Sequence, residues 1–140
     1  MIVLDTNVIS EALRPGCNLA VRSWLNARAE TELFTTSITF AELLSGVAIM
    51  TLGHRKQELS RALDEFVAPL FSGRCLAFDV AAAKQYAKIL ASMRERGRAI
   101  GPLDCQIAAI AAASRMKIAT RDARPFAEAG LEVINPWADE

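Results

Sequence analysis

Short runs of apolar, mostly branched residues alternate along this chain with longer stretches in which apolar residues recur at helical spacing. The short runs predict strands at residues 2–4, 33–36, 75–78, 117–120 and 132–134. Such alternation is typical of a parallel sheet covered by helices. We therefore expect a single α/β domain spanning residues 1–140, with no internal repeat and no linker.

The clearest helices are predicted where apolar residues lie three and four positions apart and so share one face. One such face carries Leu59, Leu63, Phe66, Val67 and Leu70, and the next carries Tyr86, Ile89, Leu90 and Met93. We expect Asp79 to cap the second of these helices and Gly97 to end it. Further helices are expected at 39–50, at about 104–116 and at 123–129, with loops at 14–16, 51–54 and 97–102.

The composition is that of an ordinary globular domain, with 52% apolar and 23% charged residues in a chain of 140. No apolar stretch approaches the ~20 residues needed to cross a bilayer, and Asp5 and Asn7 interrupt the apolar N-terminal run. We therefore expect a cytoplasmic protein with no membrane partner. Cys17, Cys75 and Cys105 are odd in number and form no CxxC pair, so we expect small core residues rather than disulfides or a zinc site.

The formal net charge is zero, which by itself does not indicate a nucleic-acid partner. Carboxylates gathered in one site would, however, offset basic residues elsewhere on the surface. Arg98 lies in the loop before Asp104, and Arg121 directly precedes Asp122, so both are candidates for contacts with phosphates. Ordinary solvated arginines at helix ends explain each of them equally well.

Two acids follow predicted strands. Asp5 comes directly after residues 2–4, and Asp122 follows residues 118–120 across Arg121. In an open parallel sheet, ligands bind beyond the carboxyl ends of the strands, so both acids are candidates for a functional site. The alternatives are local: a hydrogen-bonded turn of Asp5, Thr6 and Asn7, and an N-cap role of Asp122 for the helix at 123–129.

Two further acids belong to the first turns of predicted helices. Asp104 opens the Ala-rich helix, where a negative charge suits the helix dipole. Glu42 lies three residues after Thr39, which is the spacing of a capping box. Each acid alone has a structural explanation, but all four are expected to converge on one edge of the sheet.

Four carboxylates in one small pocket require either raised pKa values or a cation between them. Oxygen ligands favour Mg²⁺ or Mn²⁺. Such an ion lowers the pKa of a bound water, orients a phosphate and neutralises charge that develops during displacement at phosphorus. The acids Asp5, Glu42, Asp104 and Asp122 therefore predict hydrolysis of phosphodiesters.

The remaining residues exclude several other chemistries. The only histidine, His54, lies in an expected polar turn, which argues against Ser-His-Asp, Cys-His and histidine-pair mechanisms. Neither GxGxxG nor a P-loop lysine motif is present. A phosphatase of the haloacid-dehalogenase type needs a second acid two residues after the first, where this chain has Asn7. A receiver domain needs paired acids and a strand-terminal lysine, and residues 133–136 supply no lysine.

Five segments together resemble one known family over the whole chain. They are MIVLDTNVISEALRP at the start, TSITFAELLSGV, GPLDCQIAAIA, IATRDARPF, and VINPW near the end. In this order and spacing they resemble the PIN-domain toxins of bacterial type II toxin–antitoxin modules, the VapC family, and in particular its FitB-like branch. The hydrophobic-DTN opening alone is only suggestive, whereas the whole set is highly specific.

The resemblance implies a three-layer α/β/α fold with a parallel sheet of about five strands. It also implies an endoribonuclease that depends on Mg²⁺ or Mn²⁺, neutralised by a VapB- or FitA-like antitoxin. A homodimer is expected, with Trp24 and Trp137 as candidates for its surface, and contact with DNA is expected only through the antitoxin complex. The alternative is a weakly active or inactive PIN protein whose main role is a DNA-binding autorepressor complex with its antitoxin.

Residue by residue, four acids match the acidic quartet of the family: Asp5, Glu42, Asp104 and Asp122. Asp5, Asp104 and Asp122 are expected to hold the metal, and Asn7 and Thr120 match the polar residues that support it. Many VapC proteins carry Asn after the Thr-Arg pair and an acid three residues later. Here Asp122 takes the first position, as in the FitB-like branch, and Pro125 takes the later one.

Overall fold

Five short parallel strands form the centre of the computed structural model, which describes residues 1–138. They are β1 (Ile2–Leu4), β2 (Leu33–Thr36), β3 (Cys75–Leu76), β4 (Lys117–Ala119) and β5 (Val133–Ile134). Their order in the sheet is β3-β2-β1-β4-β5, which places β1 in the middle. All four neighbouring pairs are parallel, and the backbone ladder continues past β1, where the Asp5 N–H donates to the Ala119 carbonyl at 3.0 Å.

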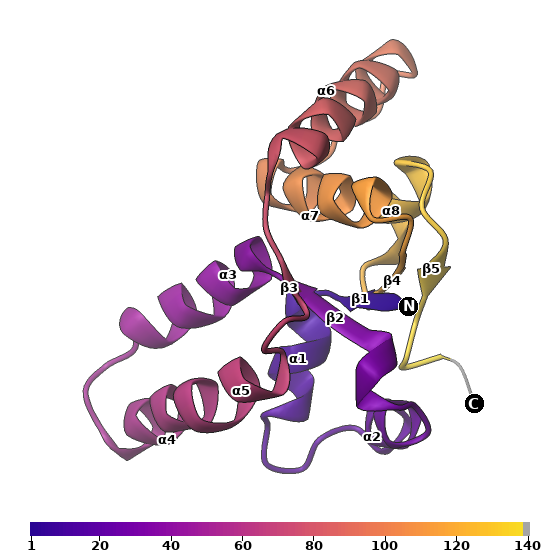
Figure 1. The fold of residues 1–140 in the computed structure, drawn as a ribbon. Coiled ribbons are helices and arrows are strands. Elements are labelled where there is room, and N and C mark those ends of the chain that lie inside the picture. The colour runs from indigo at the N-terminus through magenta and orange to yellow at the C-terminus, as the bar shows by residue number, and fades with distance from the viewer. Residues whose placement is uncertain (139–140) are drawn as a thin grey trace.

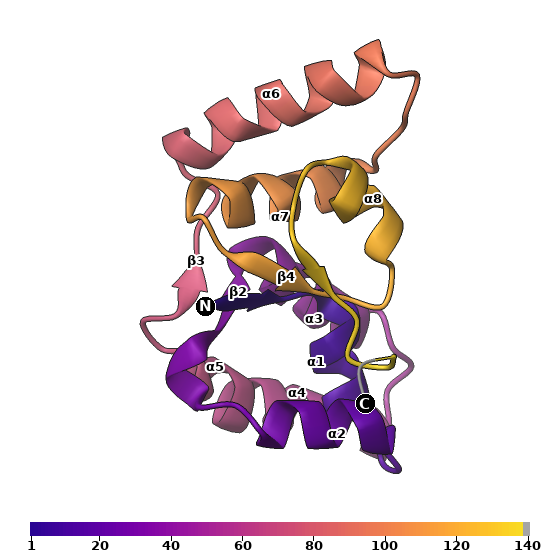
Figure 2. The same ribbon diagram turned by 90° about the vertical axis from the view of Figure 1, so that its right-hand side faces the viewer.

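Helices connect successive strands and cover both faces of the sheet. They are α1 (Thr6–Ala12), α2 (Leu19–Asn26), the 3₁₀ turn η1 (Glu30–Glu32), α3 (Ser37–Ala48), α4 (His54–Ala62), the π-helical turn η2 (Leu63–Val67), α5 (Ala68–Leu70), α6 (Val80–Glu95), α7 (Pro102–Ala113) and α8 (Ala123–Glu128). In Figures 1 and 2, α6, α7 and α8 lie on one side of the sheet and α1, α2, α4 and α5 on the other. The expected α/β/α fold is confirmed.

The core has one part on each face of the sheet, because successive strand residues point in opposite directions. Ala119 packs with Leu4, Val8 and Trp24 on the side of α1 and α2. Its neighbour Ile118 packs on the other side, against α6, α7 and α8. The buried, Ala-rich part of α7 lets this helix approach both the sheet and α6 closely.

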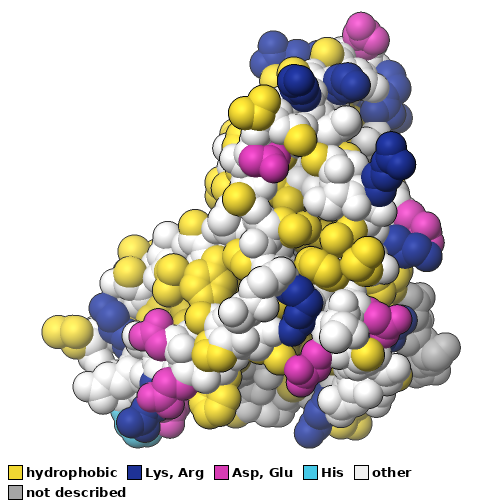
Figure 3. Space-filling model, in the orientation of Figure 1, with side chains coloured by type: hydrophobic (Ala, Val, Ile, Leu, Met, Phe, Trp, Pro, Cys, Tyr) yellow, Lys and Arg dark blue, Asp and Glu magenta, His cyan; other side chains and the backbone are white. Residues whose placement is uncertain are grey.

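The predicted ends of α6 are confirmed. The Asp79 carboxylate accepts a hydrogen bond from the Ala82 N–H at 2.9 Å, and Gly97 takes a positive φ of 66° just after the helix. That backbone conformation is readily available to glycine and stops the helix. Basic side chains gather over the outer end of α6, at the top of Figure 3, although the net charge of the chain is zero.

The predicted apolar face at residues 59–70 is partly wrong. Leu63 and Val67 are buried, but Phe66 is 66% exposed and Leu70 is 41% exposed. The reason is the π-helical turn η2, which inserts a wider turn between α4 and α5 and changes the direction in which the following side chains point. The helical spacing assumed a regular α-helix throughout.

Several smaller expectations are corrected. His54 is the first residue of α4, not part of a loop, and its Nε2 lies 2.8 Å from a carboxylate oxygen of Glu58. Cys105 is buried as expected, but Cys75 is exposed and Cys17 is half-buried, because Cys75 lies on an edge strand and Cys17 in a surface turn. Trp24 packs inside the core at 5% exposure, so it contributes no free surface to a dimer.

The ends of several other elements also differ from the predicted ones. The strands expected at 75–78, 117–120 and 132–134 are shorter, and α7 begins at Pro102 and ends at Ala113. The helix expected at 39–50 begins two residues earlier, at Ser37. Among residues 1–138, no helix combines the length and apolar character that crossing a bilayer requires.

Candidate functional site

The four acids identified from the sequence line one cleft at the carboxyl edge of the sheet. Its volume is about 470 Å³, and Asp5, Glu42, Asp104 and Asp122 all border it. They come from four places in the fold: the end of β1, helix α3, the first turn of α7 and the junction between β4 and α8. Parallel strands bring these segments together because all their carboxyl ends meet at one edge.

Asp5 is the most deeply embedded of the four, with only 5% of its surface exposed. One carboxylate oxygen accepts a hydrogen bond from the Thr6 N–H at 2.8 Å, and the other accepts one from the Thr120 hydroxyl, also at 2.8 Å. The local turn considered for this segment therefore exists, since Asp5 occupies the N-cap position of α1. The same turn fixes the carboxylate at the mouth of the central strand.

Asn7 and Thr120 link the two strand ends around Asp5. The Asn7 amide donates to the Thr120 hydroxyl at 3.1 Å and lies 3.4 Å from the nearer oxygen of Asp5. Its side-chain oxygen accepts from the Arg121 N–H at 3.1 Å. Thr120 is fully buried and in turn accepts from the Asp122 N–H at 3.1 Å. This network restricts the orientation of Asp5 and ties β1 to the segment that carries Asp122.

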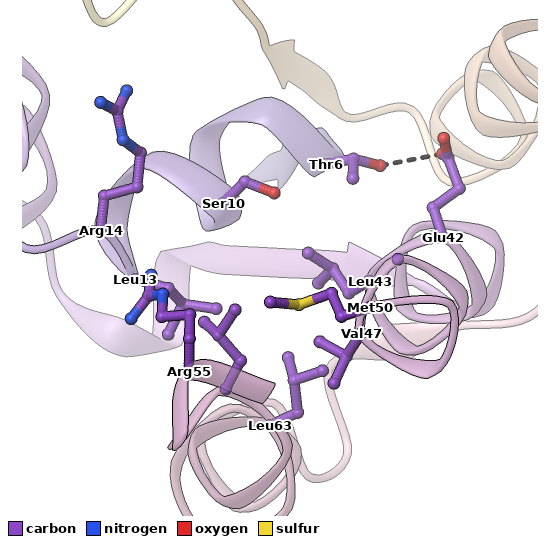
Figure 4. A pocket seen from close by; sticks show the side chains of 12 residues that line it. Thr6, Ser10, Leu13, Arg14, Glu42, Leu43, Val47, Met50, Arg55 and Leu63 are labelled. Carbon is purple, nitrogen blue, oxygen red and sulfur yellow. Dashed lines mark hydrogen bonds between the residues drawn. The ribbon is translucent and has the colours of Figure 1, made fainter. Parts of the chain in front are cut away.

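Glu42 is held by a residue of α1, not by its own helix. Its carboxylate accepts a hydrogen bond of 2.9 Å from the Thr6 hydroxyl, drawn as the dashed line in Figure 4. The capping box expected from Thr39 and Glu42 is wrong, because α3 begins earlier. Thr36 is the N-cap, and its hydroxyl accepts from the Thr39 N–H at 3.0 Å. Glu42 therefore lies in the second turn and is free to face the cleft.

Asp104 and Asp122 border the same cleft from the opposite face of the sheet. Asp104 lies in the first turn of α7, as expected. Asp122 occupies the N-cap position of α8, but within residues 1–138 its side chain makes no capping hydrogen bond. Asp122 is thus the N-cap by position, as considered from the sequence, but its carboxylate accepts no capping hydrogen bond from the described residues of α8.

The electrostatics of the cleft disfavour so many negative charges. Burial raises the pKa of Asp5; the hydrogen bonds from Thr120 and Thr6 oppose this rise, and the charges of Glu42 and Asp122 add to it. Burial likewise raises the pKa of Asp104, and the charges of Asp5 and Asp122 raise it further. A cation placed among these groups would remove the repulsion.

The donor atoms fit a hard divalent cation, because all of them are carboxylate, hydroxyl or amide oxygens. Within residues 1–138, no three acidic, histidine or cysteine side chains converge closely enough to hold one ion together. Mg²⁺ does not require such a cluster, since it usually keeps several waters and binds through one or two carboxylates. Asp5 with Asp104 or Asp122 would be sufficient.

Basic and aromatic residues complete the cleft. Arg121 lines it, with its guanidinium carbon 5.5 Å from the centre of the Trp137 ring. Arg98 is not among the lining residues within the described part of the chain, and its guanidinium lies 3.9 Å from Glu128 instead.

Among the described residues, sequence reasoning missed five that line the cleft: Thr6, Ser10, Glu11, Arg14 and Trp137. Arg14 is held by Glu11 at 3.1 Å. The one sequence feature that indicated this pair is that Glu11 and Arg14 lie three residues apart, a spacing that lets an acid and a base meet on a helix. Nothing in the sequence indicated that the pair borders the cleft.

Comparisons with known proteins match residues 2–131 to the PIN domain. The chain is 47% identical to the plasmid stability protein StbB of Pseudomonas syringae and 44% identical to a VapC ribonuclease of Sinorhizobium fredii. Each alignment covers 98% of this chain and at least 98% of the relative. The toxin FitB of Neisseria gonorrhoeae is 42% identical over 99% of this chain and all of its own length.

The solved structure of FitAB bound to an IR36 DNA fragment superimposes with a TM-score of 0.95. Its sequence identity to this chain is 41%, and the match covers all of this chain and 98% of the other. The fold, the length and the sequence thus agree over the same residues. This chain belongs to the PIN-domain family.

Proposed function

We propose that this chain is a divalent-metal-dependent endoribonuclease that acts as the toxin of a toxin–antitoxin pair. The observation that carries the proposal is the convergence of Asp5, Glu42, Asp104 and Asp122 on one cleft. The cleft leaves room for substrate and has acidic walls and arginines at its edge. Relatives of similar length that are named as a VapC ribonuclease and as a toxin support the same activity.

In this proposal Asp5, Asp104 and Asp122 hold Mg²⁺ or Mn²⁺ directly or through water. When bound, such an ion supplies an activated water and neutralises charge at the phosphate. The raised pKa values of Asp5 and Asp104 support this assignment, because burial and, to a smaller extent, neighbouring carboxylates disfavour their charged forms, which a bound cation would stabilise. Asn7 and Thr120 contribute by fixing the direction of the Asp5 carboxylate.

The remaining groups position the RNA and the attacking water. Glu42, held by Thr6, is placed to accept a hydrogen bond from that water and to orient it. Arg121 and Arg14 border the cleft and would bind phosphates on either side of the bond that is cut. Arg98 has no part in this scheme, because its guanidinium lies near Glu128 instead.

The partners follow from the relatives. We propose that a VapB- or FitA-like antitoxin neutralises this chain, and that the chain reaches DNA only as part of that complex, as FitAB does in its DNA-bound structure. We propose a cytoplasmic location, because the proposed RNA substrates lie there. The homodimer remains a prediction. A mass of twice 15.2 kDa in light scattering would support it, and a monomeric mass would contradict it.

A second candidate function is a weakly active or inactive protein whose main role is the DNA-binding complex with the antitoxin. The solved structure of FitAB bound to a DNA fragment favours this alternative. The net charge of zero makes strong DNA binding by the isolated chain unexpected, so the alternative needs the antitoxin to supply the contacts.

The deciding experiment is cleavage of total RNA and transfer RNA by the purified chain with Mg²⁺, Mn²⁺ or EDTA. We expect cutting with either metal and none with EDTA. The variant Asp5→Asn should cut at least about 100-fold more slowly, whereas Asp64→Asn, which changes an exposed acid outside the cleft, should cut as the wild type does. The absence of cutting by the wild type under all conditions would contradict the nuclease and favour the second candidate.

A further inference from the structure

A second cavity adjoins the acidic cleft between α1, α3 and α4. Its volume is about 290 Å³, close to the range of small-molecule sites. We call it the side pocket, and Figure 4 shows its residues. Its walls are mostly apolar and include Leu13, Leu43, Val47, Met50, Leu59 and Leu63.

The side pocket and the acidic cleft share part of their lining. Thr6, Ser10, Arg14 and Glu42 border both of them. The hydrogen bond from Thr6 to Glu42 lies at this boundary, in the upper right part of Figure 4. A ligand whose reacting group lies among the carboxylates would therefore have its adjoining part at the entrance of the side pocket.

The chemistry of the side pocket matches one nucleotide of an RNA strand. A base needs apolar contact for its faces and polar groups at its edge, and the leucines and Met50 provide the first while Ser10 and Thr6 provide the second. Arg14 and Arg55 add positive charge for the backbone. Both have exposed side chains, 63% and 44%, so both are accessible to phosphates. Arg14 lies 3.1 Å from Glu11 and Arg55 lies 3.8 Å from Glu58, so a glutamate positions each guanidinium at the rim of the pocket.

We propose that the side pocket receives the base of a nucleotide next to the bond that is cut. This inference rests on the proposed ribonuclease function and adds to it a site that reads the substrate. Sequence-specific recognition of RNA uses single-stranded bases that are splayed out of the stack, which suits a pocket beside the reacting phosphate. The side pocket then contributes to the choice of the RNA sequence that is cut.

Gly46 offers a way to fill the pocket without harming the fold. It lines the side pocket from α3, and no heavy atom from another part of residues 1–138 lies within 4 Å of the position of an added Cβ. Leucine is also more favourable than glycine inside a helix. Gly46→Leu should therefore fold at least as well as the wild type while occupying the space meant for the base. Ser45→Leu adds the same side chain on an exposed neighbour outside the pocket and is the matched control.

The experiment compares intact and abasic substrates. After the cleavage site of the wild type has been mapped, RNA oligonucleotides are made in which either nucleotide flanking that site lacks its base. For one of the two positions we expect kcat/KM of the wild type to fall about 10- to 100-fold, the usual cost of losing the contacts of one base. Gly46→Leu should cut the intact RNA as slowly as the abasic one, and Ser45→Leu should behave like the wild type.

Three results would overturn the inference in distinguishable ways. If Gly46→Leu still discriminates between intact and abasic RNA as the wild type does, the side pocket does not receive a base, although the nuclease stands. If Gly46→Leu cuts normally but escapes inhibition by the co-encoded antitoxin, the pocket belongs to a protein partner instead. If the wild type cuts no RNA with either metal, the proposed function fails, and this inference fails with it.

Discussion

Asp5 and Glu11 lie at the two ends of α1, line the same cleft and are nearly equally buried, at 5% and 8% exposure. Yet their pKa values move in opposite directions. The backbone N–H of Asn18 and the guanidinium of Arg14 lower the pKa of Glu11, whereas burial and neighbouring acids raise that of Asp5. Burial alone therefore does not decide the state of a carboxylate. The groups around it do.

The opposite pKa shifts distinguish a carboxylate that stabilises the fold from carboxylates that are candidates for catalysis in the same cleft. Glu11 accepts from the Asn18 N–H at 2.8 Å and from Arg14 at 3.1 Å, so it joins the end of α1 to the start of α2 and holds Arg14 at the rim. The charges of Asp5 and Asp122 add to the effect of burial in raising the pKa of Asp104, and the charges of Glu42 and Asp122 add to it in raising that of Asp5. The protein balances the charge of Glu11 itself, whereas a bound cation would be needed to stabilise the charges of Asp5 and Asp104 in the same way.

The largest expected effect is on the rate of RNA cleavage, which should distinguish Asp5 and Asp104 from Glu11. Asp5→Asn and Asp104→Asn should each lower kcat/KM for RNA cleavage by roughly 100- to 1000-fold, the loss typical of removing one group that stabilises developing charge. Glu11→Gln should retain most of the activity, because Glu11 acts on the fold and on Arg14. The measurement is the initial rate on a single RNA substrate with saturating Mg²⁺. An equal loss in all three variants would contradict the comparison.

A smaller loss is expected at Thr6. Thr6→Val removes the hydroxyl that donates to Glu42 at 2.9 Å but keeps the N–H that donates to Asp5. Loss of a residue that orients a catalytic group typically costs about 10- to 100-fold. We expect the loss in kcat more than in KM, and Thr6→Ser should restore the rate. Failure of serine to restore it would assign Thr6 a packing role.

The convergence of the acids could be predicted because it depends on topology alone. Parallel strands have their carboxyl ends at one edge, so acids after residues 4 and 120 meet whatever the detailed packing is. Asp79 and Gly97 likewise act within a few residues of chain, and their effects on α6 were predictable for that reason.

What could not be predicted depends on contacts between distant segments. The π-helical turn at Leu63–Val67 has no marker in the sequence and turned Phe66 outwards. Glu42 matched the spacing of a capping box, but its partner is Thr6, 36 residues earlier. The position of Arg14 at the cleft depends on the direction of α1 relative to α3, and no local pattern of residues encodes that direction.

The stability of the metal-free protein offers a third test. The pKa of Asp104 in the folded state is raised above its usual 3.8, so ionised Asp104 disfavours folding, and stability falls as pH rises from 3.8 through the raised value. Asp104→Asn should therefore be more stable than the wild type at pH 7 in EDTA, and the difference should vanish below about pH 3. Urea unfolding at both pH values measures it.

Added Mg²⁺ should reverse this order. A ligand that binds only the folded state stabilises it in proportion to the logarithm of its concentration above Kd. The melting temperature of the wild type should rise with Mg²⁺, and that of Asp104→Asn should rise less. If the wild type were more stable than Asp104→Asn in EDTA at pH 7, the charge of Asp104 would not destabilise the metal-free protein. The cleft would then have no need of a cation at this position.

The smallest effect on stability is expected for a change of Glu11, and its sign is opposite to that expected for Asp104→Asn. Its folded pKa lies below the usual 4.5, so its ionised form favours folding. That contribution is fully present above about pH 4.5 and is lost as pH falls through the lowered value. Glu11→Gln should therefore be less stable than the wild type at pH 7 and approach it in acid, as followed by urea unfolding from pH 7 to 3. Glu95→Gln, at an exposed acid of α6, provides the control. If Glu11→Gln gained stability at neutral pH as Asp104→Asn is expected to do, Glu11 would belong with the unbalanced carboxylates, and the cleft would hold one more group available to a cation.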